Sequence, residues 1–251
     1  MSIVDMPEKD KLELRTKIKA RFPMLVPAVR FVRKMNERYV QGLPLMFKSQ
    51  HEIFDEIYRT NLWGDSTSRS GPGSNLVQTE QIRQAIPALL KKYQVKTLLD
   101  VPCGDFFWMK ELNLDLDQYT GGDIVQEIVD TNTRLYGNDK RRFIHMDVLK
   151  DTLPKADLIL CRDLFVHLSL KDIHTAINNM KKSGATYLLA SSYVDTPANE
   201  HIFTGLFRPI NLQKAPFNFP QPIETINENC SEDIQMYKDK SQCLWRIKDL
   251  K

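Results

Sequence analysis

Short apolar runs alternate with helical patterns from residue 95 onward. This alternation is typical of a parallel β-sheet whose strands are joined by crossover helices. The uninterrupted apolar residues at 158–160 and 188–190 indicate strands that are buried on both faces of the sheet. The pattern predicts strands over residues 95–101, 118–124, 141–147, 156–162 and 185–193, with two more near 222–227 and 242–250. We therefore predict an α/β fold, with a seven-stranded, mostly parallel sheet, helices on both faces and an antiparallel closing hairpin.

Helix signals lie between these strands. Residues 124–136 have a helical pattern that stops at Gly137, for which we predict a left-handed cap. Residues 169–172 have the sequence of a capping box and begin a helix that ends near Gly184. His167 is therefore expected in the turn between the fourth strand and this helix.

The chain is long enough for one α/β domain and an extension, and we predict a helical extension over residues 1–50 and the domain over 51–251. Between Arg15 and Arg38, basic residues interleave with apolar ones at helical spacing, and only Glu37 opposes them. This segment is either a helix packed on the domain with a solvated basic side, or a peripheral contact to a membrane surface or an anionic partner.

After Tyr193, prolines interrupt the chain, and we predict a lid-like insertion over about 195–222. Arg208 is a candidate for binding a phosphate or carboxylate of a substrate. The alternative is that the aromatic residues hold this loop against the domain. Four phenylalanines are candidate walls of a substrate pocket: Phe203, Phe207, Phe217 and Phe219.

Composition narrows the class of protein. Hydrophobic residues make up 42% and charged residues 27%, which is a globular balance. The net charge of +3 is too small to favour nucleic acid as a partner. The sequence has no signal-peptide pattern and no run of 18 apolar residues, so we predict a cytoplasmic protein without a transmembrane segment. Four separated cysteines contain no CxxC pair, and we predict no metal site.

Acidic residues stand where the predicted strands end. Asp100 ends the first strand, and the chain then turns through Gly104 and Asp105. Ligands of open α/β sheets bind at this edge. A dinucleotide would require a turn with three glycines and no carboxylates near its phosphates. A nucleoside that carries positive charge and no phosphate, such as S-adenosylmethionine, suits these acids better.

Two more strand ends carry acids. Asp123 lies close to the interval of about 20 residues after Asp100 that is expected for a carboxylate bound to ribose. Asp147 ends the third strand and is a candidate acceptor for an adenine amino group, with Met146 or Val148 packed on the ring. Each acid alone is more often a turn or cap residue, but three in this order favour an adenosyl ligand.

The segment from Asp100 to Phe106 resembles the glycine-rich first motif of the class I, Rossmann-like S-adenosylmethionine-dependent methyltransferases, with only its central glycine retained. The resemblance covers about residues 54–250. It implies S-adenosylmethionine as methyl donor and S-adenosylhomocysteine as product. The residues that it implies for donor binding are Asp100, Pro102, Gly104, Asp105, Asp123, Ile124, Asp147, Val148 and Arg162.

Residues 61–83 resemble the lead-in of bacterial members that are associated with capsular and other surface polysaccharides. Here Trp63 is a candidate stacking group and Arg69 a candidate clamp for the carboxylate of the donor. Ser74 belongs to a turn rich in hydroxyl groups that precedes a helix beginning near Gln78, and this turn is expected to fold over the donor. The alternative is an ordinary surface loop.

Transfer to a hydroxyl group requires alignment of the acceptor and removal of a proton. His167 is the candidate base, and Asp163 either replaces it or orients its imidazole. The alternative is that His167 only anchors the following helix. We predict O-methylation of a carbohydrate or another small-molecule acceptor. The resemblance implies surface-polysaccharide biosynthesis as the process in which this reaction takes part. The rival hypotheses are an RNA or protein methyltransferase, a catalytically silent donor-binding scaffold, and a Rossmann-type dehydrogenase or epimerase.

Overall fold

The structure is a computed structural model that describes residues 40–232 and 237–250. The basic segment between Arg15 and Arg38, and with it most of the predicted extension, lies outside the described residues. The chain divides into two compact units, of which the second runs from Leu45 to the end. Apart from helix α3, which begins in the first unit, the elements described below belong to the second.

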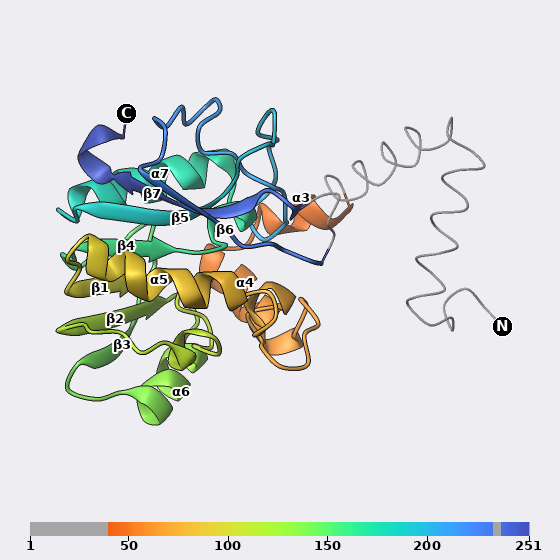
Figure 1. The fold of residues 1–251 in the computed structure, drawn as a ribbon. Coiled ribbons are helices and arrows are strands. Elements are labelled where there is room, and N and C mark those ends of the chain that lie inside the picture. Colours follow the sequence, from red (N-terminus) through yellow and green to blue (C-terminus); the bar gives the residue numbers. More distant parts are fainter. Residues whose placement is uncertain (1–39, 233–236, 251) are drawn as a thin grey trace. The chain divides into compact units, whose positions relative to one another are not determined.

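A seven-stranded sheet forms the centre of the unit, in the order β3-β2-β1-β4-β5-β7-β6 (Figure 1). Neighbours from β3 to β5 are parallel, whereas β7 pairs antiparallel with both β5 and β6. This confirms the predicted sheet and its closing hairpin. The strands are β1 (Thr97–Asp100), β2 (Gln118–Asp123), β3 (Arg141–His145), β4 (Leu158–Cys161), β5 (Tyr187–Tyr193), β6 (Glu224–Asn227) and β7 (Lys240–Arg246).

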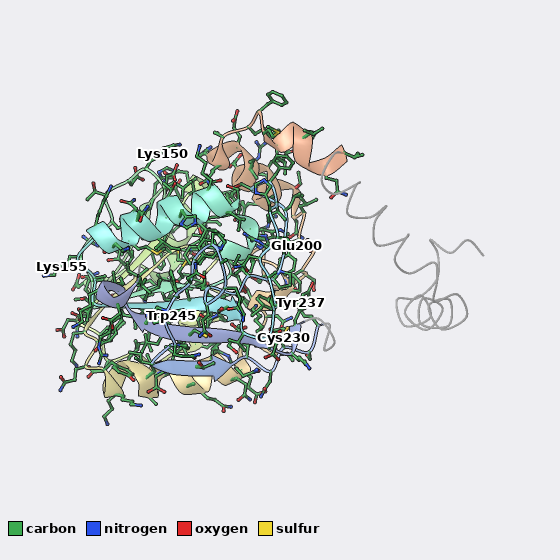
Figure 2. All side chains as sticks on the ribbon, turned by 90° about the horizontal axis from the view of Figure 1, so that it is seen from above. Lys150, Lys155, Glu200, Cys230, Tyr237 and Trp245 are labelled. Carbon is green, nitrogen blue, oxygen red and sulfur yellow. The ribbon has the colours of Figure 1, made fainter. Side chains whose placement is uncertain are left out.

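Helices cover both faces of the sheet, as predicted. Helices α5 and α6 contribute buried side chains to the hydrophobic cluster on one face, and α7 contributes to the cluster on the other. Figure 2 shows α5 and α7 on opposite sides of the strands. The helices are α3 (Gly42–Leu45), α4 (Gln50–Thr60), α5 (Glu80–Lys92), α6 (Gln126–Tyr136) and α7 (Leu170–Lys182), with short 3₁₀ helices η3 (Pro72–Ser74), η4 (Met109–Glu111), η5 (Phe165–His167) and η6 (Ile247–Asp249).

The central strands are apolar on both faces because each face has its own core. Leu99, Ile159 and Leu188 lie in register across three strands and pack on the α7 side. Their sequence neighbours Leu98 and Leu158 pack on the α5 side. The uninterrupted apolar runs in the sequence therefore correspond to strands with two buried faces.

The predicted start of α7 is confirmed, with an addition from a distant loop. The Ser169 hydroxyl accepts a hydrogen bond from the Asp172 backbone N–H. The Ser169 N–H donates to the Thr204 hydroxyl at 2.9 Å, and that hydroxyl donates to the Asp172 carboxylate at 2.5 Å. Thr204 thus completes the capping box and ties the insertion to this helix.

Gly137 follows α6 as predicted, but the predicted left-handed cap is wrong. Its φ of −63° and ψ of 139° are extended values that any residue can adopt. Glycine is needed here for space, because a Cβ atom would lie 2.5 Å from the backbone oxygen of Thr133.

The insertion between β5 and β6 is packed down on the domain. Phe217 and Phe219 are both 4% exposed and belong to the core, with the Phe219 ring 5.3 Å from that of Trp245. The Asn211 side-chain amide donates to the carbonyls of Val194 and Thr196. The prediction that Phe217 and Phe219 wall a substrate pocket is therefore wrong, and the alternative, that aromatic residues hold the loop down, is correct for both.

We expect Gly137→Ala to lower the free energy of unfolding by about 1–3 kcal/mol, because the added methyl group meets backbone that cannot move aside freely. Urea denaturation measures this change. The matched control is Leu135→Ala at an exposed position in the last turn of α6, with an expected effect within about 0.5 kcal/mol. A neutral or stabilising Gly137→Ala would contradict the close approach.

Candidate active site

A cavity opens at the carboxyl ends of β1, β2 and β4, with an empty volume of about 1070 Å³ that includes space open to solvent. Its walls come from the turns after these strands, the end of β3, helix α4 and the loop before η3. In Figure 2, Glu200, Cys230 and Tyr237 mark this end of the sheet, opposite Lys155, which precedes β4. This is the edge at which the sequence predicted a ligand.

The turn after β1 depends on Gly104. Its φ of +54° is a left-handed value, and a Cβ atom would lie 2.3 Å from the Ser70 hydroxyl oxygen. The Gly104 N–H donates to Asp123 at 3.0 Å, and its carbonyl accepts from the Asn132 amide at 2.8 Å. The one glycine retained from the motif is therefore the one that links β1, β2 and the lead-in loop.

Asp105 fastens the lead-in loop to this turn. Its carboxylate accepts hydrogen bonds from the hydroxyls of Ser68 and Ser70 and from the backbone N–H of Arg69. The Arg69 guanidinium lies over the Tyr58 ring at 5.3 Å and is largely exposed. Asp105, Arg69 and the buried Ser74 all line the cavity, so the loop forms one of its walls.

Asp123 is buried at the end of β2 and lines the cavity. One carboxylate oxygen accepts from the Gly104 N–H and the other from the Val125 N–H, both at 3.0 Å. Burial raises its pKa to about 6 against the opposing effect of these N–H groups. A carboxylate has about four acceptor positions, so two remain for a ligand.

Asp100 ends β1, is 3% exposed and also lines the cavity. Its carboxylate accepts a 2.6 Å hydrogen bond from the Tyr119 hydroxyl. Burial raises its pKa to about 7, and Tyr119 offsets only part of that effect. Within residues 40–232 and 237–250, no lysine or arginine forms an ion pair with Asp100, Asp105 or Asp123. This part of the cavity is therefore suited to a cation or to hydroxyl donors.

The third predicted acid is not part of the cavity. Asp147 is absent from the cavity wall, and its carboxylate accepts from the Leu149 N–H at 3.0 Å and pairs with the Lys150 ammonium at 2.9 Å. Its neighbours Met146 and Val148, the predicted apolar contacts for an adenine ring, do line the cavity.

Helix α4 supplies cavity residues that the sequence analysis did not identify: Gln50, Phe54, Ile57 and Tyr58. The Gln50 side-chain nitrogen is buried and has no hydrogen-bond partner among the described residues. The ring of its neighbour His51 lies 6.0 Å from that of His145, which places the first turn of α4 beside the end of β3. The capping box of Ser49 and Glu52 was a signal in the sequence that could have located this helix.

Four charged groups lie together after β4, after β6 and at the start of β7, and all but the partly exposed Asp163 are buried: Arg162, Asp163, Glu228 and Lys240. Arg162 donates to Glu228 at 2.7 Å and to the Gly73 carbonyl at 2.7 Å. Lys240 contacts Asp163 at 2.6 Å and Glu228 at 3.4 Å. We call this set the charge quartet. Arg162 lines the cavity as predicted, but its guanidinium is directed to these partners.

Asp163 lines the cavity, although its carboxylate is fully engaged. It accepts from the Ser191 hydroxyl as well as from Lys240, and its backbone has a left-handed φ of +57°. Burial raises the pKa of Asp163, but Lys240 and Arg162 outweigh burial and hold that pKa well below its ordinary value. The Lys240 ammonium and the Ser191 hydroxyl thus occupy the carboxylate oxygens that would have to accept a proton from a substrate.

His167 ends η5 and lines the cavity. Its Nδ1 lies 3.1 Å from the Leu206 carbonyl oxygen, and its ring stacks on that of Trp63 with centroids 4.8 Å apart. Burial lowers the pKa of His167 to about 4, so the imidazole is neutral at pH 7. Trp63 therefore does stack in the cavity wall, with the candidate base as its partner.

The prediction that Arg208 binds an anionic substrate is wrong. Arg208 is 5% exposed, and its guanidinium donates to the carbonyls of Phe165, Leu168 and Glu200. All of its contacts are thus made inside the protein.

Among the described residues, no group of three or more His, Cys, Asp and Glu side chains is arranged to hold a metal ion. No helix in the described ranges is long and apolar enough to cross a membrane.

Comparison with known proteins places this cavity in a known fold. No family model and no curated protein matches the sequence. Among solved structures, the N-methyltransferase NodS from Bradyrhizobium japonicum WM9 is similar at 17% identity, with 69% of this chain and 98% of that chain covered and a TM-score of 0.53. The chain has the class I S-adenosylmethionine-dependent methyltransferase fold.

Two further structures with this fold contain the methyl donor. Magnesium protoporphyrin IX methyltransferase from Synechocystis PCC 6803 with bound SAM has 15% identity, covers 78% of this chain and 96% of its own, and has a TM-score of 0.52. Human N-acetylserotonin methyltransferase in complex with SAM has 15% identity, 79% and 60% coverage, and a TM-score of 0.51. At these identities, the likeness establishes the fold.

We expect Asp100→Asn to stabilise the ligand-free protein more at high pH than at low pH. Because the folded-state pKa of Asp100 lies above the ordinary value, its contribution to the free energy of unfolding falls as the pH rises from about 4 to about 7. Asparagine mimics the protonated acid, so the gain should be about 2 kcal/mol larger at pH 8 than at pH 5.

Urea denaturation at the two pH values measures this difference, with Asp117→Asn as the control at an exposed acid. Equal effects of Asp100→Asn at both pH values would show that the buried carboxylate is compensated in the folded protein.

Proposed function

We propose that this protein is an S-adenosylmethionine-dependent methyltransferase that methylates a hydroxyl group of a carbohydrate or another small-molecule acceptor. The observation that carries the proposal is the pair of buried acids, Asp100 and Asp123, which face the cavity without a cationic partner among the described residues. Burying two carboxylates costs free energy unless a ligand supplies positive charge or hydroxyl donors. An adenosyl donor with an α-ammonium group, a sulfonium and a ribose offers both.

The residues around the cavity fit the parts of this donor. Asp123 has acceptor positions left for the two ribose hydroxyls, and Asp100 is suited to the cationic end. The apolar side chains of Ile124, Met146 and Val148 would pack on the adenine ring. Arg69 is the proposed partner of the donor carboxylate. S-adenosylmethionine supplies a methyl group that is activated by its bond to a positively charged sulfur.

The acceptor side of the cavity is aromatic and carries His167. A neutral imidazole can accept a hydrogen bond from a hydroxyl group and remove its proton during transfer. Asp163 is bound by Lys240 and Arg162 and is therefore not proposed as the base. The resemblance of the lead-in loop to enzymes associated with surface polysaccharides supports a carbohydrate acceptor and a cytoplasmic location, which we propose on that ground alone.

Calorimetric titration with S-adenosylhomocysteine tests the donor, and NAD is the comparison ligand for the dehydrogenase or epimerase hypothesis. We expect S-adenosylhomocysteine to bind and NAD not to bind. Binding of NAD without S-adenosylhomocysteine would refute the proposal. Donor binding without methyl transfer to any hydroxyl acceptor would favour a silent scaffold.

We expect Asp123→Asn to weaken S-adenosylhomocysteine binding by about 10- to 100-fold, because an amide accepts fewer and weaker hydrogen bonds than a carboxylate.

Binding to the wild type should also weaken by about tenfold between pH 8 and pH 5.5, since the ionised form of Asp100 attracts the ammonium group and its pKa is about 7. Calorimetry at both pH values measures these effects. Asp117→Asn is the control, and a pH-independent affinity would contradict the role of Asp100.

We expect Gln50 to contribute to recognition of adenine, since it lines the cavity near the end of β3 and its buried side-chain nitrogen has no partner among the described residues. Its N–H groups can only donate, so the wild type should bind S-adenosylhomocysteine about tenfold more tightly than its 1-deaza analogue, in which a C–H group replaces the acceptor nitrogen N1. Gln50→Met should abolish this preference.

The control on the exposed side of α4 is Glu56→Gln, which should keep the preference. If Gln50→Met weakens binding of both ligands equally, Gln50 shapes the cavity without recognising the base.

A further inference from the structure

We propose that residues 203–208 fix the imidazole of His167 as the tautomer with a proton on Nδ1, so that Nε2 is left as a hydrogen-bond acceptor for the cavity. Arg208 is the positioning residue that holds this arrangement. The structural part of the proposal is independent of the reaction, and its catalytic part rests on the proposed function.

The backbone of this segment is bound to η5. The Gly205 N–H donates to the His167 carbonyl at 2.8 Å, and the Arg208 N–H donates to the Val166 carbonyl at 3.0 Å. Gly205 has a φ of +100°, and a Cβ atom there would lie 2.6 Å from a methyl carbon of Ile53. This close approach to α4 requires glycine, so the segment is held between α4 and η5.

Arg208 strengthens the attachment from inside the protein. Its guanidinium donates to the Phe165 carbonyl at 2.6 Å and to the Leu168 carbonyl at 2.8 Å, which are the residues on either side of the Val166–His167 pair. No carboxylate forms an ion pair with Arg208 in the described part of the chain. Burial lowers its pKa only to about 10, so it is charged at neutral pH. A buried cation bound by three carbonyls is costly to displace, and it fixes the path of η5.

The hydrogen bond of the His167 ring then selects one tautomer. A carbonyl oxygen can only accept, so the Nδ1 atom that lies 3.1 Å from the Leu206 oxygen must carry the proton. In a neutral imidazole, Nε2 is then unprotonated. The stacked Trp63 ring on one side and the Phe207 ring, 5.7 Å away, limit rotation of the imidazole.

Burial keeps the His167 imidazole neutral. Burial is the largest effect and lowers its pKa to about 4, and the positive charges of Arg208 and Lys240 act in the same direction. The Leu206 carbonyl and the Asp163 carboxylate oppose them without reversing the shift. An unprotonated Nε2 therefore persists across the neutral and mildly acidic range.

This arrangement suits the hydroxyl acceptor of the proposed function. A hydroxyl group can donate its hydrogen to Nε2 and direct an oxygen lone pair at the methyl carbon. The hydroxyl oxygen forms the new bond to carbon, the bond from that carbon to sulfur breaks with its electron pair remaining on sulfur, and the hydroxyl proton passes to Nε2.

Long-range proton–nitrogen correlation NMR of the ¹⁵N-labelled full chain tests the tautomer directly. The His167 signals are assigned by their loss in His167→Gln. We expect a protonated Nδ1 and an unprotonated Nε2 in the wild type from pH 8 to pH 5. A proton on Nε2, or an imidazolium at pH 7, would overturn the proposal, and this measurement needs no variant of Arg208 to fold.

Arg208→Lys tests the positioning role, because lysine keeps the charge but cannot bridge several carbonyls. We expect mixed tautomers, a His167 pKa that moves toward its ordinary value, and a fall in kcat of about tenfold or more with an unchanged KM for the donor. The control is Arg246→Lys at an exposed position at the far end of β7, which should leave all three unchanged. If a folded Arg208→Lys protein keeps the wild-type tautomer and pKa, Arg208 does not position His167.

The two proposals fail in different ways. If S-adenosylhomocysteine does not bind but the Nδ1-protonated tautomer is observed, the proposed function fails and the structural inference stands. If the donor binds and transfer occurs with the other tautomer, the positioning inference fails alone.

Discussion

Two buried carboxylates at the carboxyl edge of the sheet constrain the rest of the molecule. Asp100 and Asp123 are each 5% exposed or less, and burial raises both of their pKa values. The fold offers them hydroxyl and N–H donors, through Tyr119, Gly104 and Val125, but no counter-charge among the described residues. A protein that keeps ionisable groups in this state loses stability at neutral pH unless a ligand supplies what is missing. The turn at Gly104 donates a hydrogen bond to Asp123, and the lead-in loop is bound to the same turn through Asp105.

The neighbouring part of the cavity wall, which Arg162 and Asp163 form after β4, has its charges compensated within the protein. In the charge quartet, two cations and two anions neutralise one another, and the anionic Glu228 also accepts from the Gln242 amide. A ligand is not needed to compensate these charges, so the quartet is suited to support the wall and to hold the loop through the Gly73 carbonyl. The contrast in charge compensation distinguishes Asp100 and Asp123, which have room for a ligand, from the charge quartet, whose members bind one another.

The sheet and its helices could be predicted because their signals are local. Apolar runs such as residues 158–160 identify strands with two buried faces, and the capping box at Ser169 marks the start of α7. The positions of Asp100 and Asp123 at the cavity also followed from strand order, since the carboxyl ends of parallel strands share one edge. The direction in which an acidic side chain points at the end of a strand could not be predicted from strand order. Asp147 lies two residues beyond the end of β3, and Leu149 and Lys150 engage its carboxylate.

Long-range partners explain the other differences between prediction and structure. Arginine is a residue type that commonly binds anions, but the Arg208 guanidinium donates to two carbonyls about 40 residues earlier in the chain, those of Phe165 and Leu168. No local pattern in the sequence shows that this guanidinium is directed into the protein. Lys240 and Glu228 likewise acquire their roles only when β7 pairs beside β5. Helix α4 and the lead-in loop, which line the cavity, and the insertion, which binds the His167 ring, all lie outside the alternating strand and helix pattern. The segment predicted from its prolines as a lid-like insertion is instead fastened through Gly205 and Arg208 to the backbone of η5. Since these contacts are made to backbone carbonyls, they hold His167 without depending on the side chains of Val166, Leu168 or Leu206.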